Sequence, residues 1–290
     1  MNYKISNGIL ELEVDSMGGE MKSLKANGKE YLWNGDPAYW KRTAPVLFPI
    51  VGSLKNKEFI FQNKKYPMGQ HGFARDMEFE TVFCKEDSVR MILNDTEETR
   101  QKYPFSFSLE NEYTLKDNKV NVRWIVTNKG NEPMYFSIGG HPAFLCPYPD
   151  APGFIHLYKD NKPIEYFECT HLTDCGTAMD VHKRYDTPGG VLRITKELFK
   201  NDALVLENYQ ADSVSLSGDD QKDYLKVDFE APLVGIWTPA GKEAPFVCIE
   251  PWYGRCDGEN FNGTLEERIW GNILEPGEVF DKNFTIEVCK

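Results

Sequence analysis

The strongest constraint on the fold is a pattern of short strand-like segments separated by turns. Ile9 to Asp15 alternates apolar and polar residues, the period of a half-buried strand. Residues 105–127 hold two longer runs of this kind, joined at Lys116-Asp117-Asn118. Strands that recur roughly every 8–12 residues, with few helices between them, are typical of a sandwich or barrel. The sequence therefore predicts an all-β fold.

Further segments fit this pattern. Asn27-Gly28 predicts a tight hairpin turn, residues 59–68 a hairpin, and residues 77–94 two strands. Residues 246–250 form a short apolar run that we expect Pro251 to stop. Residues 147–190 are expected to form a loop-rich excursion from the sheet. Helical signals occur in three short stretches: Glu97 to Tyr103, Lys196 to Lys200 and Leu265 to Trp270.

The length and composition are those of a globular protein. The chain has 290 residues, of which 41% are hydrophobic and 27% charged. Such a chain can bury a sizeable core without disulfides or a metal. No linker or fixed-period repeat is visible, so we expect a single domain over residues 1–290. The oligomeric state, monomer or homodimer, stays open.

Charge and cysteine usage exclude several classes of function. The net charge of −12 repels nucleic acid and anionic lipid, although a few local arginines can still bind a small anion. The seven cysteines are odd in number and lack a CxxC spacing, which predicts reduced thiols and neither a disulfide framework nor a zinc site. The first residues lack a signal-peptide core, and no run is long and apolar enough for a membrane helix. We therefore expect a cytoplasmic protein.

Two segments place an ionisable residue beside a strand. Gly139-Gly140 ends an apolar strand and Pro142 fixes the backbone that follows, which leaves His141 little freedom. Glu250 lies at the end of the run from Phe246, where partial burial would raise its pKa toward the range of a general base. A structural histidine and a solvent-facing edge glutamate are the simpler alternatives.

Two earlier segments carry candidate ligands for a substrate. Arg42 precedes an apolar run with Pro45 and Pro49, and two prolines so close together disfavour a central strand. The planar guanidinium of Arg42 suits sugar hydroxyls, although a surface arginine explains it as well. In the segment QHGFAR at 70–75, His71 is a candidate proton donor or hydroxyl ligand and Arg75 a candidate anion ligand. A histidine satisfied within a hairpin is the alternative.

Together these segments resemble the aldose 1-epimerase (galactose mutarotase) superfamily. The closer match is the branch that contains hexose-6-phosphate mutarotases and their bacterial relatives. The matching segments occur in the family's order and span most of the chain: Arg42 with APVLFPIVG, QHGFAR at 70–75, GGHPAF at 139–144 and CIEPWYG at 248–254. The resemblance implies a large antiparallel β-sandwich, the galactose mutarotase-like supersandwich, with its active site on a concave face.

The resemblance also implies roles for individual residues. Glu250 would be the general base and His141 the general acid, while Arg42 and His71 would bind substrate hydroxyls. Asp202 is the best match for an aspartate that contacts the sugar, although it could equally cap a turn. The implied reaction is ring opening to the aldehyde and reclosure, which requires no metal, nucleotide or redox cofactor.

The sugar itself is left open by the sequence. Arg75 matches a position used by phosphate-handling members, but Asp76 and Glu78 place negative charge beside it. A free aldose and an aldose 6-phosphate therefore remain balanced as the small-molecule substrate. A glycoside hydrolase would need two carboxylates about the scissile bond, whereas the prominent partner of Glu250 is a histidine. A non-catalytic carbohydrate-binding protein is the other alternative, although it would be expected to lose Glu250 or His141.

Overall fold

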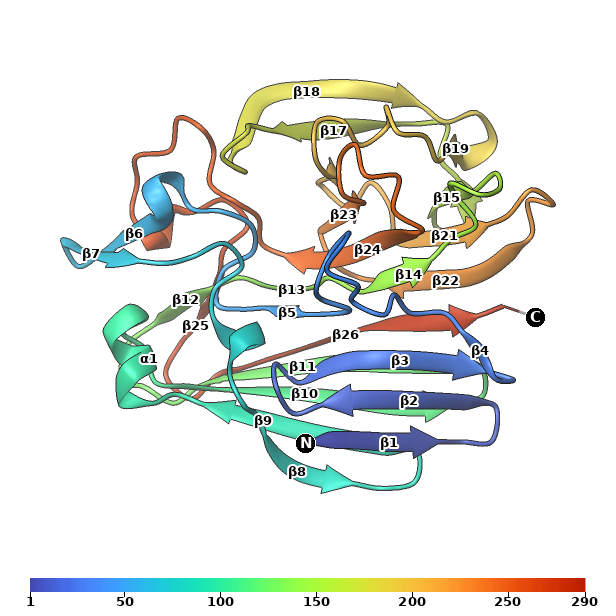
Figure 1. Ribbon diagram of the computed structural model, residues 1–290. Coiled ribbons are helices and arrows are strands. Elements are labelled where there is room, and N and C mark those ends of the chain that lie inside the picture. Colours follow the sequence, from blue (N-terminus) through green and yellow to red (C-terminus); the bar gives the residue numbers. More distant parts are fainter. Residues whose placement is uncertain (290) are drawn as a thin grey trace.

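Two large antiparallel sheets dominate the computed structural model, which describes residues 1–289 (Figure 1). The first sheet has ten strands. Nine of them follow one path, and β19 (Val191–Arg193) pairs with β15. The order along that path is β16 (Lys162–Pro163), β15 (Phe154–Lys159), β21 (Ser213–Ser217), β22 (Asp223–Phe229), β26 (Val279–Val288), β11 (Lys119–Asn128), β10 (Phe107–Lys116), β9 (Ser88–Asn94) and β8 (Glu80–Cys84).

The second sheet has eight strands and crosses the upper half of the view in Figure 1. Seven follow one path, and β14 (Ala143–Leu145) pairs with β24. The order is β18 (Ala178–Asp186), β17 (Tyr166–Leu172), β20 (Leu204–Leu206), β23 (Leu233–Trp237), β24 (Phe246–Tyr253), β13 (Ile138–Gly140) and β5 (Val46–Leu47). The expected all-β sandwich is thus confirmed.

Smaller elements complete the described chain. A four-stranded sheet holds β1 (Asn2–Ser6), β2 (Leu10–Asp15), β3 (Glu20–Ala26) and β4 (Lys29–Glu30). Two further pairs are β12 (Met134–Phe136) with β25 (Asn272–Leu274), and β6 (Glu58–Phe61) with β7 (Lys64–Pro67). The helices are α1 (Glu97–Lys102) and four 3-10 turns at Lys55–Lys57, Ala74–Asp76, Pro188–Gly190 and Leu265–Glu267. No helix within residues 1–289 is long and apolar enough to cross a membrane.

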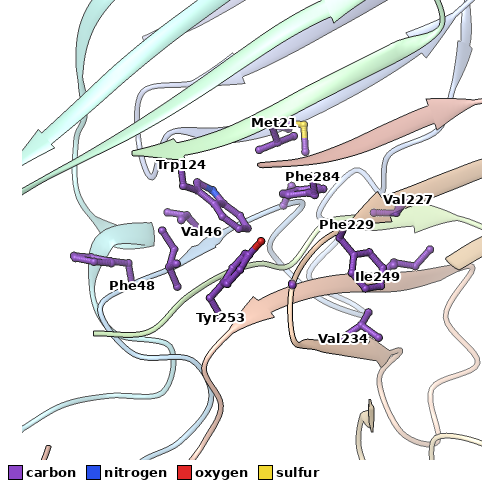
Figure 2. Packing of buried hydrophobic residues seen from close by; sticks show 14 of the residues in the cluster. Met21, Val46, Phe48, Trp124, Val227, Phe229, Val234, Ile249, Tyr253 and Phe284 are labelled. Carbon is purple, nitrogen blue, oxygen red and sulfur yellow. The ribbon is translucent and has the colours of Figure 1, made fainter. Parts of the chain in front are cut away.

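The core fills the space between the two large sheets. Trp124 of β11 and Phe284 of β26 pack together at a ring-centroid distance of 5.2 Å and point toward Val46 and Tyr253 of the eight-stranded sheet (Figure 2). A Cβ on Gly140 would come within 3.2 Å of the Trp124 ring. The absence of a side chain at this position therefore lets the strand that precedes His141 lie directly on the core.

The strand pattern of the first half of the chain is confirmed. Both long runs of residues 105–127 are strands, and the segments 59–68 and 77–94 each form a pair of strands. The two-proline segment after Arg42 contributes only the two residues of β5, at the edge of its sheet, as expected for proline-containing chain. The helix expected from Glu97 is α1, capped by reciprocal hydrogen bonds between Thr96 and Thr99.

Three expectations for the second half were wrong. Residues 147–190 are not loop-rich, since they hold the strands β15 to β18. β18 has few apolar residues because it is an edge strand with most of its side chains exposed, so the alternation that marks a strand is missing. Residues 196–200 form turns instead of a helix, and the helix expected from Leu265 to Trp270 is only a 3-10 turn at Leu265–Glu267.

Pro251 also does not stop its strand, because β24 continues to Tyr253. The reason lies in how β24 changes partner along one of its edges. It pairs with β14 up to Cys248 and with β13 from Trp252 onward. Pro251 falls in the gap between these ladders, where its missing N–H removes no hydrogen bond to either strand.

Candidate active site

Strand register places His141 opposite Glu250. β13 and β14 run beside β24 in a single antiparallel register, with Gly139 paired to Trp252 and Ala143 to Cys248. His141 lies midway between the first members of these pairs, and Glu250 midway between the second. The two side chains meet where the ladder is interrupted, with His141 Nε2 3.2 Å from Glu250 Oε2.

The pair lines a pocket of about 290 Å³. Glu250 is 1% exposed and His141 7%, so both are almost fully withdrawn from solvent. Trp40 stacks on the His141 imidazole at a centroid distance of 4.7 Å, and Trp237 meets it edge-on at 5.4 Å. The remaining lining comes from several elements: Gly52, Gln70, His71, Arg75, Thr170, Leu172, Gly176, Ala178, Asp202, Ala203, Val205, Trp252, Arg255 and Cys256.

Burial shifts the two central residues in opposite directions. Loss of water raises the pKa of Glu250 well above its usual value, and the negative charge of Asp202 raises it further. Burial, followed by the positive charges of Arg75 and Arg42, lowers the pKa of His141 to about 3. The uncharged form of each group is therefore favoured, a protonated carboxyl for Glu250 and a neutral imidazole for His141.

The Trp252 indole forms part of the pocket and lies flat over two glycines. A Cβ on Gly139 or on Gly235 would come within 2.5 Å of the ring. Gly235 is also the residue of β23 that pairs with Glu250. Trp252 and Trp237 both line the pocket, and aromatic rings of this kind suit the apolar face of a sugar ring.

His71 reaches the same pocket from a strained turn. Its φ is +64°, and the φ of the following Gly72 is +69°. A Cβ on Gly72 would lie 2.2 Å from the carbonyl oxygen of Phe48, so only glycine fits there. Gly52 N–H donates to His71 Nδ1 at 3.0 Å, which leaves Nε2 to carry the proton of the neutral ring. Burial and the nearby His141 lower the pKa of His71 well below its usual value.

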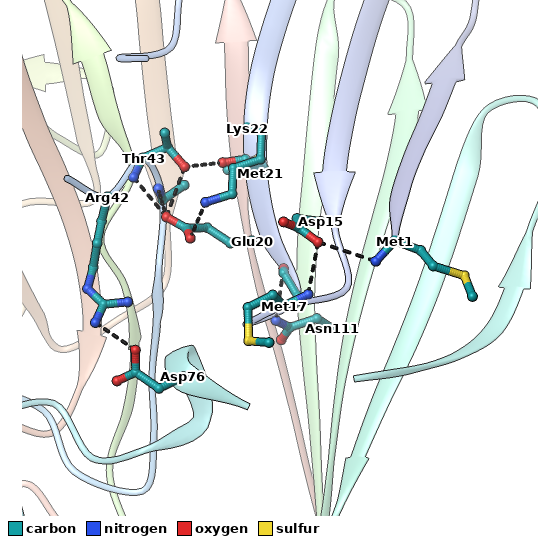
Figure 3. A network of polar contacts seen from close by, with 12 residues as sticks. Met1, Asp15, Met17, Glu20, Met21, Lys22, Arg42, Thr43, Asp76 and Asn111 are labelled. Atoms are coloured by element: carbon teal, nitrogen blue, oxygen red, sulfur yellow. Dashed lines mark hydrogen bonds and ion pairs between the residues drawn. The ribbon is translucent and has the colours of Figure 1, made fainter. Parts of the chain in front are cut away.

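The two predicted arginines occupy different positions. Arg75 lines the pocket and donates from Nη2 to the carbonyl oxygen of Gln70 at 2.7 Å. Arg42 lies beside the pocket and is not part of its lining. Its Nη2 donates to Asp76 at 2.8 Å (Figure 3), and Asp76 also lies 3.8 Å from Arg75 Nε. The negative charge expected beside Arg75 is thus present and is shared between two arginines.

A buried carboxylate holds the segment that carries Arg42. Glu20 accepts hydrogen bonds from the backbone N–H groups of Thr43 and Ala44 at 2.8 and 2.9 Å, and from the Thr43 hydroxyl at 2.9 Å. Lys22 donates to the other oxygen of Glu20 at 2.6 Å (Figure 3). Through these contacts the four-stranded sheet fixes the backbone that follows Trp40 and Arg42.

Asp202 lines the pocket and has a left-handed backbone, with φ +72°. One carboxylate oxygen accepts from the N–H of Ala203 at 2.8 Å. The sequence left open whether Asp202 caps a turn or contacts the sugar, and this hydrogen bond is the one expected of a turn residue. The second oxygen is available to a ligand, and the charge of this carboxylate raises the pKa of Glu250.

Sequence reasoning missed Trp40 and Arg255 as lining residues. Trp40 lies just before Arg42 in a segment that was already singled out, so its position was the available signal. Arg255 follows the matched segment 248–254 by one residue and carries no pattern of its own. Its contact with Glu207, 3.4 Å away, joins residues 48 positions apart and had no local signature.

One group of side chains has the composition of a metal site. Ligand atoms of His141, Cys248 and Glu250 lie within 4.8 Å of one another. Burial raises the pKa of the Cys248 thiol well above its usual value, and Glu250 raises it further. A protonated thiol is a poor metal ligand. Two of the three residues also form the pair on which acid–base chemistry depends, and the seven cysteines are all free thiols.

Comparison with known proteins agrees with the fold. The family model for aldose 1-epimerase matches residues 1–287. The chain is 31% identical to the plasmid-encoded protein LacX of Lactococcus lactis, over all of this chain and 97% of that protein. A galactose mutarotase related enzyme from Lactobacillus acidophilus is 35% identical with a TM-score of 0.90, covering 100% of this chain and 98% of that one. A galactose mutarotase-like protein from Lactobacillus casei is 27% identical with a TM-score of 0.91, covering both chains fully. The chain therefore belongs to the aldose 1-epimerase family.

Proposed function

We propose that this protein is a mutarotase that interconverts the α and β anomers of an aldose or an aldose 6-phosphate. The observation that carries the proposal is the contact between Glu250 and His141, 3.2 Å apart in a pocket sized for a small molecule. Membership of the aldose 1-epimerase family supports a sugar as the substrate. Aromatic rings beside the pair suit the apolar face of a pyranose.

The reaction requires one base and one acid on the two oxygens of the anomeric carbon. The Glu250 carboxylate takes the proton of the C1 hydroxyl while protonated His141 gives a proton to the ring oxygen. The bond between C1 and the ring oxygen breaks, and C1 becomes the aldehyde carbon. Rotation about C1–C2 presents the other face of the aldehyde to the C5 hydroxyl. Both proton transfers then reverse and the ring closes as the other anomer.

The pair carries one proton at every stage of this reaction. The open-chain stage has a protonated Glu250 and a neutral His141, which is the form that burial favours for both groups. The cyclic stages have the same single proton on His141. Each half-reaction therefore moves protons within the pair and the sugar, without exchange with solvent.

The other polar residues provide contacts to the sugar hydroxyls. His71 donates from Nε2, Asp202 accepts at its free oxygen, and Arg75 donates from its guanidinium. Arg42 can contact the sugar only if its side chain turns away from Asp76. In the arrangement seen here it binds Asp76 and so helps to neutralise the carboxylate that lies beside Arg75.

A polarimetric assay tests the proposal. Freshly dissolved α-D-glucose and α-D-galactose are followed to equilibrium with and without protein, and anomer-enriched glucose 6-phosphate is followed by NMR. The expected result is acceleration over buffer that is lost in Glu250→Gln and His141→Asn. Two matched controls, Glu80→Gln at an exposed position of β8 and His156→Asn at a buried histidine outside the pocket, keep their activity.

The same samples separate the alternatives. Release of nitrophenol from aryl glycosides, lost in Asp202→Asn and Glu250→Gln, would make the protein a glycoside hydrolase. Binding of a sugar without any acceleration of anomer exchange would make it a carbohydrate-binding protein. Either result contradicts the proposed function.

A further inference from the structure

Arg255 is a charged side chain of the pocket that lacks hydrogen-bond acceptors. It follows β24 directly and lines the same pocket as Glu250 and His141. The residue is only 9% exposed, and its buried Nε and Nη1 have no hydrogen-bond partner within residues 1–289. A buried charged donor without an acceptor is costly, and such groups are rare unless a ligand completes them. This guanidinium therefore points to an acceptor that comes with the substrate.

Glu207 fixes Arg255 without satisfying it. Glu207 Oε1 lies 3.4 Å from Arg255 Nε, close enough for charge attraction but without a formed hydrogen bond. The same oxygen accepts from the Thr170 hydroxyl at 2.6 Å, and the other accepts from Trp270 Nε1 at 2.9 Å. Since Glu207 forms no hydrogen bond with Arg255, the Nε and Nη1 donors of Arg255 remain for a group that offers acceptors.

The other charged residues of the pocket determine where a negatively charged group of a ligand can bind. Arg75 is a second lining arginine, and its buried Nε also lacks a hydrogen-bond partner. The acid nearest to it, Asp76, has a side chain that is 59% exposed and is not part of the lining. On the lining itself, the Asp202 carboxylate repels an anion. An acidic group is therefore accommodated at Arg255, whose positive charge and unpaired donors offset this repulsion.

We infer that Arg255 is a specificity residue that binds an acidic substituent of the sugar, a phosphate or a carboxylate, through its unpaired guanidinium nitrogens. The planar fork of arginine matches both groups in a bidentate arrangement. Neutral hydroxyls elsewhere on the sugar would be bound by the residues of the proposed function. The inference rests on that proposed function for the identity of the ligand as a sugar.

The test compares neutral and acidic sugars that share a ring. Anomer exchange of glucose, glucose 6-phosphate and glucuronate is measured by NMR for the natural protein, Arg255→Gln and Arg255→Lys. Arg184→Gln, an exposed arginine of β18 paired with Asp186, is the control. Binding of glucuronate, glucose 6-phosphate and inorganic phosphate is measured in parallel by calorimetry, which does not depend on turnover.

The expected result is a rise in KM for one or both acidic sugars of about tenfold to a hundredfold in Arg255→Gln. Arg255→Lys should recover part of this loss because it keeps the charge, and the KM for glucose should change by less than about twofold. Which acidic sugar responds decides between phosphate and carboxylate. An equal loss for glucose and the acidic sugars would contradict the inference, as would natural protein that neither binds nor turns over an acidic sugar.

Failure of the proposed function gives a different result. In that case no sugar exchanges anomers faster than in buffer, yet an anion site at Arg255 still binds phosphate or glucuronate and loses this binding in Arg255→Gln. If Arg255→Gln does not fold, the affinities of the natural protein and of Arg255→Lys are compared instead. The inference would be overturned if these proteins bound glucuronate and glucose 6-phosphate no more tightly than glucose.

Discussion

At the scale of single residues, the site depends on two groups whose uncharged forms are favoured by burial. Glu250 loses nearly all of its hydration, and His141 lies in contact with it and beneath Trp40. Burial raises the pKa of the Glu250 carboxyl and lowers the pKa of the His141 imidazole, so the charged form of each is disfavoured. Burial of the two groups does not add to the stability of the fold, but it places them in contact for proton transfer.

The buried carboxyl of Glu250 predicts a pH-dependent gain in stability for Glu250→Gln. The native pKa is raised above the unfolded value of about 4.3, so wild-type stability is full below that value and falls as the pH rises through the native pKa. Glutamine does not titrate. Urea unfolding should show similar stability at pH 4 and an advantage for Glu250→Gln of at least about 1 kcal/mol at pH 8, since one pKa unit corresponds to about 1.4 kcal/mol. A difference that does not change with pH would contradict this, and Glu80→Gln serves as the exposed control.

The same shifts predict the pH profile of catalysis. The active pair holds one proton, and a second proton is added only near the lowered pKa of His141, about 3. We therefore expect kcat/KM for a neutral aldose to fall by less than about twofold when the pH is lowered from 7.5 to 5.5. An acid limb with an apparent pKa near 6.5 would show that His141 titrates as an ordinary surface histidine does.

At the scale of elements, the site is a product of register. β24 changes partner from β14 to β13 at the position where Pro251 lacks an N–H, and His141 lies in that interruption. On the other edge of β24, Gly235 pairs with Glu250 and leaves room for the Trp252 ring. The strands β13, β14, β23 and β24 thus place His141, Glu250 and the Trp252 ring close together.

A side chain on β23 should disturb this floor. In Gly235→Ala the added Cβ would lie 2.5 Å from Trp252 Cζ2, so the indole must move. Overpacking of this kind costs about 1–3 kcal/mol, measured as the free energy of unfolding in urea, and a displaced ring should lower kcat/KM as well. Gly258→Ala, where an added Cβ meets no atom within 4 Å, is the matched control. Equal effects of the two substitutions would contradict the packing of Trp252 described here.

Strands with one face in the core could be predicted from sequence, but the pairing of the strands that carry the site could not. Alternation of apolar and polar residues in 105–127 revealed β10 and β11, because each has one face in the core. The exposed β18 has no such face and was taken for loop. Opposition of His141 and Glu250 depends on a register between segments about a hundred residues apart, which no local pattern contains. Arg255 and Glu207 were missed for the same reason.

At the scale of the whole molecule, the four-stranded sheet supports the site from outside the two large sheets. Glu20 of β3 binds the backbone of Thr43 and Ala44, and the Trp40–Arg42 segment precedes these residues directly (Figure 3). The site therefore depends on the four-stranded sheet as well as on the eight-stranded sheet, which with its loops provides most of the lining.

Glu20→Ala tests how much this anchor contributes to stability and activity without changing the residues of the pocket. It removes the acceptor of two backbone N–H groups and one hydroxyl, and hydrogen bonds to a charged group contribute about 1.5–3 kcal/mol each. We expect a loss of at least about 2 kcal/mol in the free energy of unfolding, together with a lower kcat/KM at temperatures where the variant is folded. Glu13→Ala, a partly exposed glutamate of β2 paired with Lys4, should cost less than about 1 kcal/mol. A Glu20→Ala variant as stable as Glu13→Ala would show that the 43–44 backbone does not need this anchor.

The central claim is that Glu250 and His141 act as one proton-transferring unit, and a double-mutant cycle of kcat/KM for anomer exchange tests it most directly. Residues that act as a unit are not additive, so Glu250→Gln, His141→Asn and the double variant should all lose activity to a similar extent, at least about a hundredfold. Single variants that each keep more than about a tenth of the wild-type value, or a double variant whose loss is the product of two independent losses, would contradict the account.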